Sequence, residues 1–159
     1  MLMQRDRKLW IRGDMNIENF FPYRVAVAAA SLSRHLENVY RREHGISREE
    51  WRVLFLLADV PSLTSKELSL RSSLDKIQIS RAAQRLEKKG LIEGQEAAED
   101  RRLRDYACTD EGRAFFEEVF PKVKARADAI LSSMSPADIK ALEQGLSALK
   151  DATARVRTH

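Results

Sequence analysis

Polar and basic side chains recur along one face of the helix that the sequence predicts for residues 74–89. On a helical wheel, Ile79, Ala82, Ala83 and Leu86 fall together on the side that would face a core. The exposed side would present arginine, glutamine and serine, which suit base edges and phosphates in a DNA major groove. The alternative interpretation is a solvated helix face. The residues on this side are Ile77, Gln78, Ser80, Arg81, Gln84, Arg85 and Lys88.

The positive charge of the chain is concentrated in the same segment. Between Arg71 and Lys89 there are six basic residues and the two acidic residues Asp75 and Glu87, which leaves a local excess of +4. The whole chain of 159 residues has the same formal charge of +4, so the remainder is balanced. This placement favours a polyanionic partner. The basic residues are Arg71, Lys76, Arg81, Arg85, Lys88 and Lys89.

A charged loop follows this helix and predicts a β-hairpin. Residues 91–93 and 105–108 have the composition of short strands, and the polar stretch 94–104 lies between them. An arginine on a narrow projecting loop can enter a minor groove, whose negative potential attracts it. Asp100 could hold a neighbouring arginine through a bidentate ion pair, although a solvated charge run is the alternative. The residues of this loop that are predicted to serve DNA binding are Asp100, Arg101, Arg102 and Arg104.

Three further helices are predicted before this region. The first runs from about Ile17 to His44, with an apolar stripe at intervals of three and four residues, and Gly45 ends it. Capping boxes of the type Ser/Thr-x-x-Glu at 47–50 and 64–67 begin the second and third helices. The order of helix, turn, helix and charged hairpin predicts a winged helix-turn-helix.

Two helices are predicted after the hairpin, which makes about six in all. Thr109 caps the fifth, in which Pro121 is expected to introduce a bend. Ser135-Pro136 begins the sixth, whose apolar residues from Ile139 to Val156 form a seam for another helix. The predicted fold is therefore mainly α with a small β-hairpin wing and a helical layer for dimerisation.

Other classes of site have little support in the sequence. The single cysteine, Cys108, excludes an internal disulfide and a cysteine-rich zinc site. The histidines His35, His44 and His159 are scattered, and no nucleophile has an evident base partner, so we expect neither a metal nor an enzyme. We also expect no cofactor. A cytoplasmic protein is expected because no signal peptide or membrane span is apparent.

Several short motifs between Ile46 and Gly112 resemble those of the MarR family of bacterial regulators, and a weaker similarity extends over nearly all of the chain. Their spacing from the helix-turn-helix to the wing also fits that family. The motifs are Glu50-Trp51-Arg52-Val53-Leu54, Leu74-Asp75-Lys76, Ser80-Arg81-Ala82, Leu86-Glu87-Lys88-Lys89-Gly90-Leu91-Ile92, Asp100-Arg101-Arg102 and Thr109-Asp110-Glu111-Gly112.

This resemblance implies a homodimer that reads a pseudo-palindromic operator in double-stranded DNA. Residues 1–45 would form a basic arm and a dimerisation helix, 46–109 the winged domain, and 110–159 the remaining helices of an intertwined dimerisation layer. Arg102 would be the minor-groove arginine, with Asp100 as its support. Ser80, Arg81 and Arg85 would face the major groove.

Two positions depart from the family pattern. Glu93-Gly94-Gln95 stands where relatives usually carry arginine, so the stem of the wing should contact phosphates less. Ile77 replaces a residue that is commonly small and polar. It is predicted either to touch a thymine methyl group or to be partly buried against the turn.

The resemblance also implies repression that is relieved by a small aromatic or phenolic ligand. The candidate pocket lies between the dimerisation layer and the winged domain, with a histidine or arginine for a carboxylate and Trp51 for a ring. For each residue, core packing or a surface ion pair is the alternative. The candidate residues are Tyr23, Ser31, His35, Trp51 and Arg52.

Two alternative functions remain open at the level of sequence. The basic face could dock an acidic protein in an interaction module that has no DNA specificity. Cys108 could serve as a redox sensor, although its place between a strand and a helix cap favours a buried thiol.

Overall fold

The computed structural model describes residues 17–156, so the basic arm predicted before Ile17 and the last histidine, His159, lie outside the described part. Six α-helices and three short strands follow a single 3-10 turn, η2 (Ile17–Asn19). The helices are α1 (Phe21–His44), α2 (Arg48–Leu57), α3 (Ser65–Ser72), α4 (Lys76–Lys88), α5 (Asp110–Leu131) and α6 (Pro136–Arg155). The mainly α winged fold expected from the sequence is confirmed.

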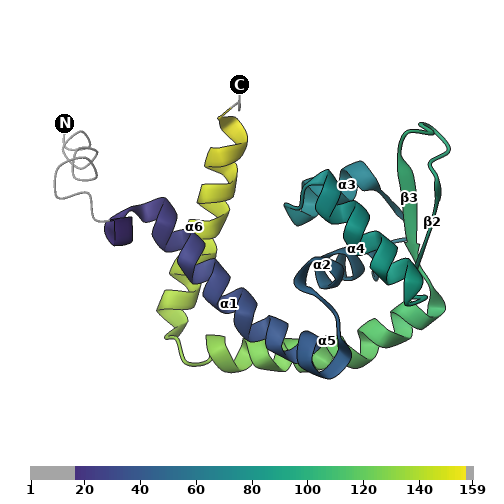
Figure 1. The fold of residues 1–159 in the computed structure, drawn as a ribbon. Coiled ribbons are helices and arrows are strands. Elements are labelled where there is room, and N and C mark those ends of the chain that lie inside the picture. Colours follow the sequence, from purple (N-terminus) through teal and green to yellow (C-terminus); the bar gives the residue numbers. More distant parts are fainter. Residues whose placement is uncertain (1–16, 157–159) are drawn as a thin grey trace.

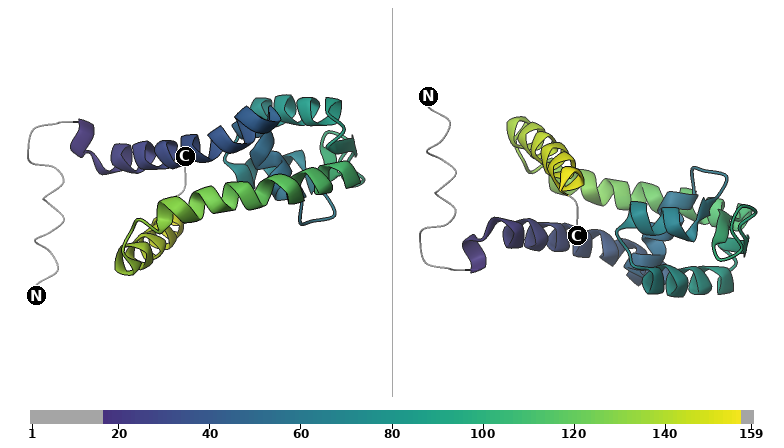
Figure 2. Two further views of the ribbon diagram at one scale, coloured as in Figure 1. Left: turned by 90° about the horizontal axis from the view of Figure 1, so that it is seen from below. Right: turned by 90° about the horizontal axis from the view of Figure 1, so that it is seen from above.

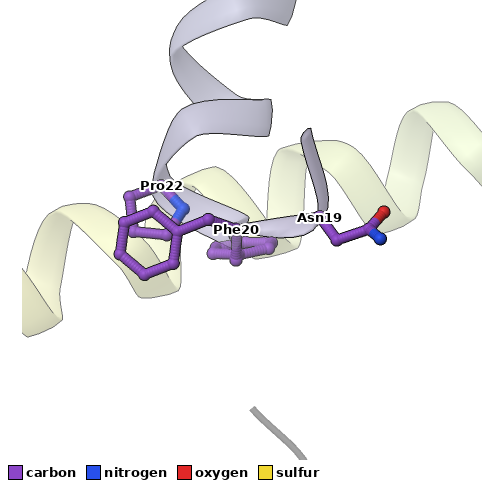
Figure 3. Close-up of a pocket in the computed structure, with 4 residues that line it drawn as sticks. Asn19, Phe20 and Pro22 are labelled. Carbon is purple, nitrogen blue, oxygen red and sulfur yellow. The ribbon is translucent and has the colours of Figure 1, made fainter. Parts of the chain in front are cut away.

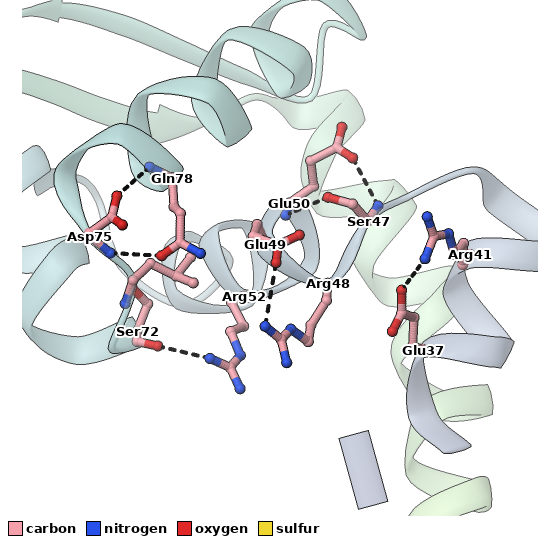
Figure 4. Close-up of polar contacts among 11 residues, drawn as sticks. Glu37, Arg41, Ser47, Arg48, Glu49, Glu50, Arg52, Ser72, Asp75 and Gln78 are labelled. Carbon is pink, nitrogen blue, oxygen red and sulfur yellow. Dashed lines mark hydrogen bonds and ion pairs between the residues drawn. The ribbon is translucent and has the colours of Figure 1, made fainter. Parts of the chain in front are cut away.

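Side-chain caps begin five of these helices. Both predicted capping boxes are present, and Figure 4 shows the one at the start of α2, where Ser47 and Glu50 satisfy each other's backbone N–H groups. A third box, which was not predicted from the sequence, joins Asp75 to Gln78. It makes α4 begin at Lys76, two residues later than expected. The N-cap residues are Ser47, Thr64, Asp75, Thr109 and Ser135.

The end of α1 agrees with the prediction from the sequence, whereas its start differs. Gly45 terminates α1 with a left-handed backbone (φ +65°), as predicted. The start of α1 differs, because η2 and Phe20 precede it and the regular helix begins only at Phe21. Pro121 lies inside α5, which continues without interruption from Asp110 to Leu131.

The strands form one antiparallel sheet in the order β1-β3-β2. The predicted hairpin consists of β2 (Ile92–Glu96) and β3 (Arg104–Cys108), paired from Ile92 with Cys108 to Glu96 with Arg104. The third strand, β1 (Leu63–Thr64), pairs with the other edge of β3. It leads directly into α3 and so attaches the helix-turn-helix to the wing.

The core of the winged unit lies between its three helices and the sheet. Leu54 and Leu57 of α2, Leu68 of α3 and Leu86 of α4 are fully buried. Val119 of α5 closes the same cluster. Each helix of the unit therefore has one apolar side fixed in the core, which sets the side that it presents to solvent.

An aromatic column joins this core to the long helices. The rings of Tyr40 and Trp51 stack at 5.1 Å, those of Trp51 and Phe116 at 5.5 Å, and those of Phe116 and Phe120 at 5.1 Å. The column thus connects α1, α2 and α5. Burial also raises the pKa of Tyr40 to about 12.

The long helices extend away from the winged unit. In Figure 1, α5 runs along the bottom of the molecule from the wing to α6, and the start of α1 lies at the far end from the wing. The ribbons of α1 and α6 overlap in that view, but both views of Figure 2 separate them. No residue of α6 is buried. Among the helices of residues 17–156, none is long and apolar enough to cross a membrane.

Replacing Gly112 with alanine should lower the free energy of unfolding by at least about 2 kcal/mol, because the new methyl group would overpack the site. A Cβ there would lie 1.9 Å from the carbonyl oxygen of Leu91 and 2.8 Å from Sγ of Cys108. The Leu91 oxygen also accepts a hydrogen bond from the backbone of Thr109 at 3.1 Å and cannot easily move.

The matched control is Gly145→Ala in α6, where nothing lies within 4 Å of the added Cβ. This variant should gain about 0.5–1 kcal/mol from helix propensity. Urea unfolding followed by circular dichroism, at one fixed protein concentration, measures both. Equal stabilities of the two variants would contradict the packing at Gly112.

Candidate nucleic-acid interface

Helix α4 has the orientation that its sequence pattern predicted. Ile79, Ala82, Ala83 and Leu86 are at most 1% exposed. All but one of the opposite side chains are exposed, and Gln78 is half-buried. The helix therefore presents a polar, basic face with one large apolar residue, Ile77, near its first turn. The exposed set is Lys76, Ile77, Ser80, Arg81, Gln84, Arg85 and Lys88.

Gln78 differs from the other predicted base readers because its side chain takes part in the helix cap. Its Oε1 accepts a hydrogen bond from the backbone N–H of Asp75 at 3.0 Å, and Oδ1 of Asp75 accepts from the backbone N–H of Gln78 at 2.8 Å (Figure 4). The amide carbonyl is thus already used. Only the NH₂ group remains, so a bidentate contact with adenine would require the cap to open.

The turn before α4 is held by hydrogen bonds from both sides. Oγ of Ser69 donates to the carbonyl of Leu74 at 2.6 Å, and Oγ of Ser72 accepts from the Leu74 N–H at 3.2 Å. Arg52 reaches across from α2 and donates to the carbonyl of Ser72 at 3.2 Å (Figure 4). Ser73 adopts a left-handed conformation (φ +58°) that reverses the chain. These contacts fix α4 relative to α2 and α3.

The far end of α4 is fixed by a buried carboxylate. Nζ of Lys89 lies 2.7 Å from Oε1 of Glu50 and donates to the carbonyl of Gly45 at 2.9 Å. Burial raises the pKa of Glu50, and hydrogen bonds from Lys89 and Ser47 lower it. The hydrogen bonds have the larger combined effect, so the pKa lies below its usual value. The group is therefore ionised and paired.

The tip of the wing projects an arginine into solvent. The side chain of Arg102 is 94% exposed. Oδ1 of Asp100 accepts from the backbone N–H of Arg102 at 3.0 Å, while Nε of the guanidinium is 3.9 Å from the same oxygen. The bidentate pair predicted from the sequence is therefore not formed. Asp100 instead shapes the turn and forms a single long ion pair with the guanidinium.

Arg104 is placed differently from the other wing arginines. It lies at the stem, where Nη2 donates to Oε1 of Glu87 at 3.1 Å and to the carbonyl of Gly94 at 3.0 Å. Its guanidinium carbon also lies 5.7 Å from the ring centroid of Tyr106. Arg104 thus links the wing to α4, a role that the sequence did not indicate.

Gly94 makes this arrangement possible. A Cβ at that position would lie 2.7 Å from the ring of Tyr106 and 2.8 Å from both Arg104 Nη2 and Glu87 Oε1. A glycine at position 94 therefore has a structural reason. A wing-stem residue without a side chain gives Arg104 access to Glu87.

The five candidate ligand residues differ in their surroundings within the described chain. Both faces of Trp51 are covered, by Tyr40 and by Phe116, so its ring is not free to stack on a ligand. Arg52 is turned toward Ser72, on the side of α3.

The other three candidates lie along α1. Tyr23, near its start, and His35, farther along, are exposed, and Ser31 between them is half-buried. Nδ1 of His35 lies 3.4 Å from Nη2 of Arg126 on α5. A hollow with a volume of about 440 Å³ lies elsewhere, beside Asn19, Phe20 and Pro22 at the start of α1 (Figure 3).

Cys108 is a buried thiol. Its Sγ lies 3.7 Å from the carbonyl oxygen of Leu91, and burial raises its pKa. A raised pKa and a buried sulfur both reduce thiolate reactivity, which disfavours the redox alternative.

Comparison with known proteins bears on the same segment. Residues 44–103 match the sequence model of the MarR family. The HTH-type transcriptional regulator FarR of Neisseria gonorrhoeae is 31% identical over 85 residues, which cover 54% of this chain and 58% of that protein. The chain thus matches somewhat more than half the length of this relative.

Two solved structures share the fold over most of the chain. The MarR family transcriptional regulator Sco3205 from Streptomyces coelicolor, solved in complex with DNA, is 24% identical with a TM-score of 0.76, and the match covers 89% of this chain and 91% of that one. BpsR of Bordetella bronchiseptica is 18% identical with a TM-score of 0.76, with 87% and 99% covered. Residues 44–103 are thus similar in sequence to the MarR family, and the chain shares its fold with a solved structure of a MarR family regulator.

Proposed function

We propose that the protein is a dimeric DNA-binding transcription regulator, a cytoplasmic repressor rather than an enzyme, which a small aromatic acid releases from its operator. The exposed polar face of α4 carries this proposal. Its side chains are fixed in direction by the buried face and by contacts at both ends of the helix. Such a rigid, basic helix suits the width of a DNA major groove.

The unpaired basic side chains of α4 support the proposal that this helix binds DNA. Among the described residues, the side chains of Lys76, Arg81, Arg85 and Lys88 form no hydrogen bond or ion pair with another part of the chain. Many of the other basic residues are engaged, as Arg41 is with Glu37. Unpaired guanidinium and ammonium groups on one helix are available to phosphates, and their binding would release counterions.

The long helices offer the surface for a dimer. Leu142, Leu146 and Leu149 of α6 are 38–53% exposed, and Phe21 and Val27 of α1 are almost half exposed. Exposed apolar side chains that line one side of a helix favour packing against a partner helix. A second copy would bring two winged units together, with recognition helices about one turn of DNA apart, ~34 Å. This supports a pseudo-palindromic operator.

Two observations support control by a ligand, one from a structural neighbour and one from this chain. DNA binding by BpsR is regulated by 6-hydroxynicotinic acid, an aromatic acid. In the present chain, His35 and Arg126 bring two nitrogen groups together between α1 and α5, a pair suited to a carboxylate. Since Trp51 is covered, the ring of such a ligand would need another contact or a shift of the aromatic column.

Replacing Arg102 with alanine should weaken operator binding by about tenfold or more and leave the dimer intact, because the exposed guanidinium would be lost from the minor groove. Fluorescence anisotropy at physiological salt measures the affinity, and light scattering measures the dimer. Arg42→Ala, an exposed arginine at the end of α1, is the control and should bind as the unmodified protein does.

Competitor DNA in the same assay separates a regulator from a protein-interaction module. A regulator should prefer its operator to random DNA by ~10³ or more. Equal affinity for both would reject the proposed function, and unchanged affinity of Arg102→Ala would reject only the role of the wing tip.

Introducing glutamate at both Leu142 and Leu146 should abolish the dimer, because the charges would be buried in the seam. Neither residue is buried within one chain, so the fold of the protomer should persist. Gln144→Glu, exposed on another side of α6, is the control for added charge. A double variant that is still dimeric by sedimentation would contradict the placement of the interface.

Arg104→Ala should weaken operator binding about threefold to tenfold by releasing the wing from α4, without changing the dependence on salt. If Arg104 instead contacted a phosphate, its loss would make the slope of log binding constant against log salt concentration less steep by about one. The double variant with Glu87→Ala should bind no worse than Arg104→Ala alone, since both residues serve one contact. A reduced slope would restore Arg104 as a DNA contact, as the sequence suggested.

A further inference from the structure

We propose that Ile77 reads the C5 methyl group of a thymine in the major groove, so that the protein prefers a T·A pair in one orientation at that position of the operator. This inference rests on the proposed function and specifies part of the DNA sequence that the protein prefers.

Ile77 occupies the exposed face of α4 and not its core. Its side chain is 63% exposed, although it is large and apolar. Partial burial against the turn, the other interpretation of the sequence, is therefore not what the structure shows. Arg81 and Gln84 follow it at intervals of four and seven residues, which places all three along one stripe of the helix.

The chemistry of the side chain restricts what it can recognise. Isoleucine has no hydrogen-bond donor or acceptor, so it cannot distinguish the oxygen and nitrogen atoms of base edges. In the major groove, thymine differs from the other bases by an apolar group, the C5 methyl. An exposed isoleucine among polar residues therefore matches thymine better than any other base.

The local structure holds Ile77 ready for this contact. It lies between Asp75 and Gln78, whose two reciprocal hydrogen bonds close the first turn of α4 (Figure 4). A β-branched side chain in a helix also has one strongly preferred χ1 rotamer. Little conformational entropy is lost when such a group meets its partner, and this favours its use in recognition.

The test removes the same contact in two ways, by deleting the thymine methyl group from the DNA and by shortening Ile77 in the protein. Footprinting first locates the operator, and each thymine in it is then replaced singly by deoxyuridine, which lacks only the methyl group. The full-length protein and its Ile77→Ala variant are titrated with every duplex. At one thymine per half-site, deoxyuridine should weaken binding by the unmodified protein about fourfold, the value expected for one buried methyl group.

The Ile77→Ala variant should lose this sensitivity at the same thymine and keep it at all others. Leu70→Ala is the matched control, because Leu70 is 74% exposed on α3 but lies outside the recognition helix. It should retain the deoxyuridine effect at the thymine assigned to Ile77. Circular dichroism of both variants verifies that they are folded.

Each outcome decides the proposal. Loss of one deoxyuridine penalty in Ile77→Ala, but not in Leu70→Ala, supports it. Specific operator binding with the same penalties in all three proteins overturns it and leaves the proposed function standing. Absence of any sequence preference in the unmodified protein overturns both.

Discussion

The carboxylate of Glu50 is the point on which the arrangement of the helices depends. It is 2% exposed, and it accepts hydrogen bonds from Lys89 after α4 and from the backbone of Ser47 before α2. Lys89 in turn holds the carbonyl of Gly45, where α1 ends. A buried charge is costly unless it is paired, so these three chain segments are constrained to meet. The pair orients α4 relative to the long helix α1.

The same contact bears on the proposed control by a ligand. A change in the direction of α1 would move Gly45, and Lys89 would carry that movement to the end of α4. The aromatic column provides a second route, since Tyr40 of α1 packs on Trp51 of α2 and Trp51 on Phe116 of α5. Packed cores transmit strain because they contain few voids. In the proposed dimer, a ligand that shifts either contact would therefore alter the spacing of the two recognition helices.

Local sequence patterns predicted most of the fold, because they depend on neighbouring residues. The boxes at Ser47 and Thr64 and the buried side of α4 are of this kind. The box at Asp75 was also visible in principle, as an aspartate followed three residues later by a glutamine. Strand β1 was not, because two residues show no alternation and its partner Tyr106 lies 43 positions along the chain.

The site was harder to predict for the same reason. The run of arginines at 101–104 predicts a DNA contact for Arg104, but it does not indicate the partner Glu87, which is 17 residues away. Nor does it indicate that a Cβ at Gly94 would crowd both side chains. The sequence predicts Trp51 as a ligand contact, and it does not indicate that Tyr40 and Phe116 cover the ring from two other helices. Composition indicates which side chains could bind DNA or a ligand, but tertiary packing decides which of them remain free. By that criterion Ile77, Arg81 and Arg102 are stronger candidates for contact with DNA than Gln78 and Arg104.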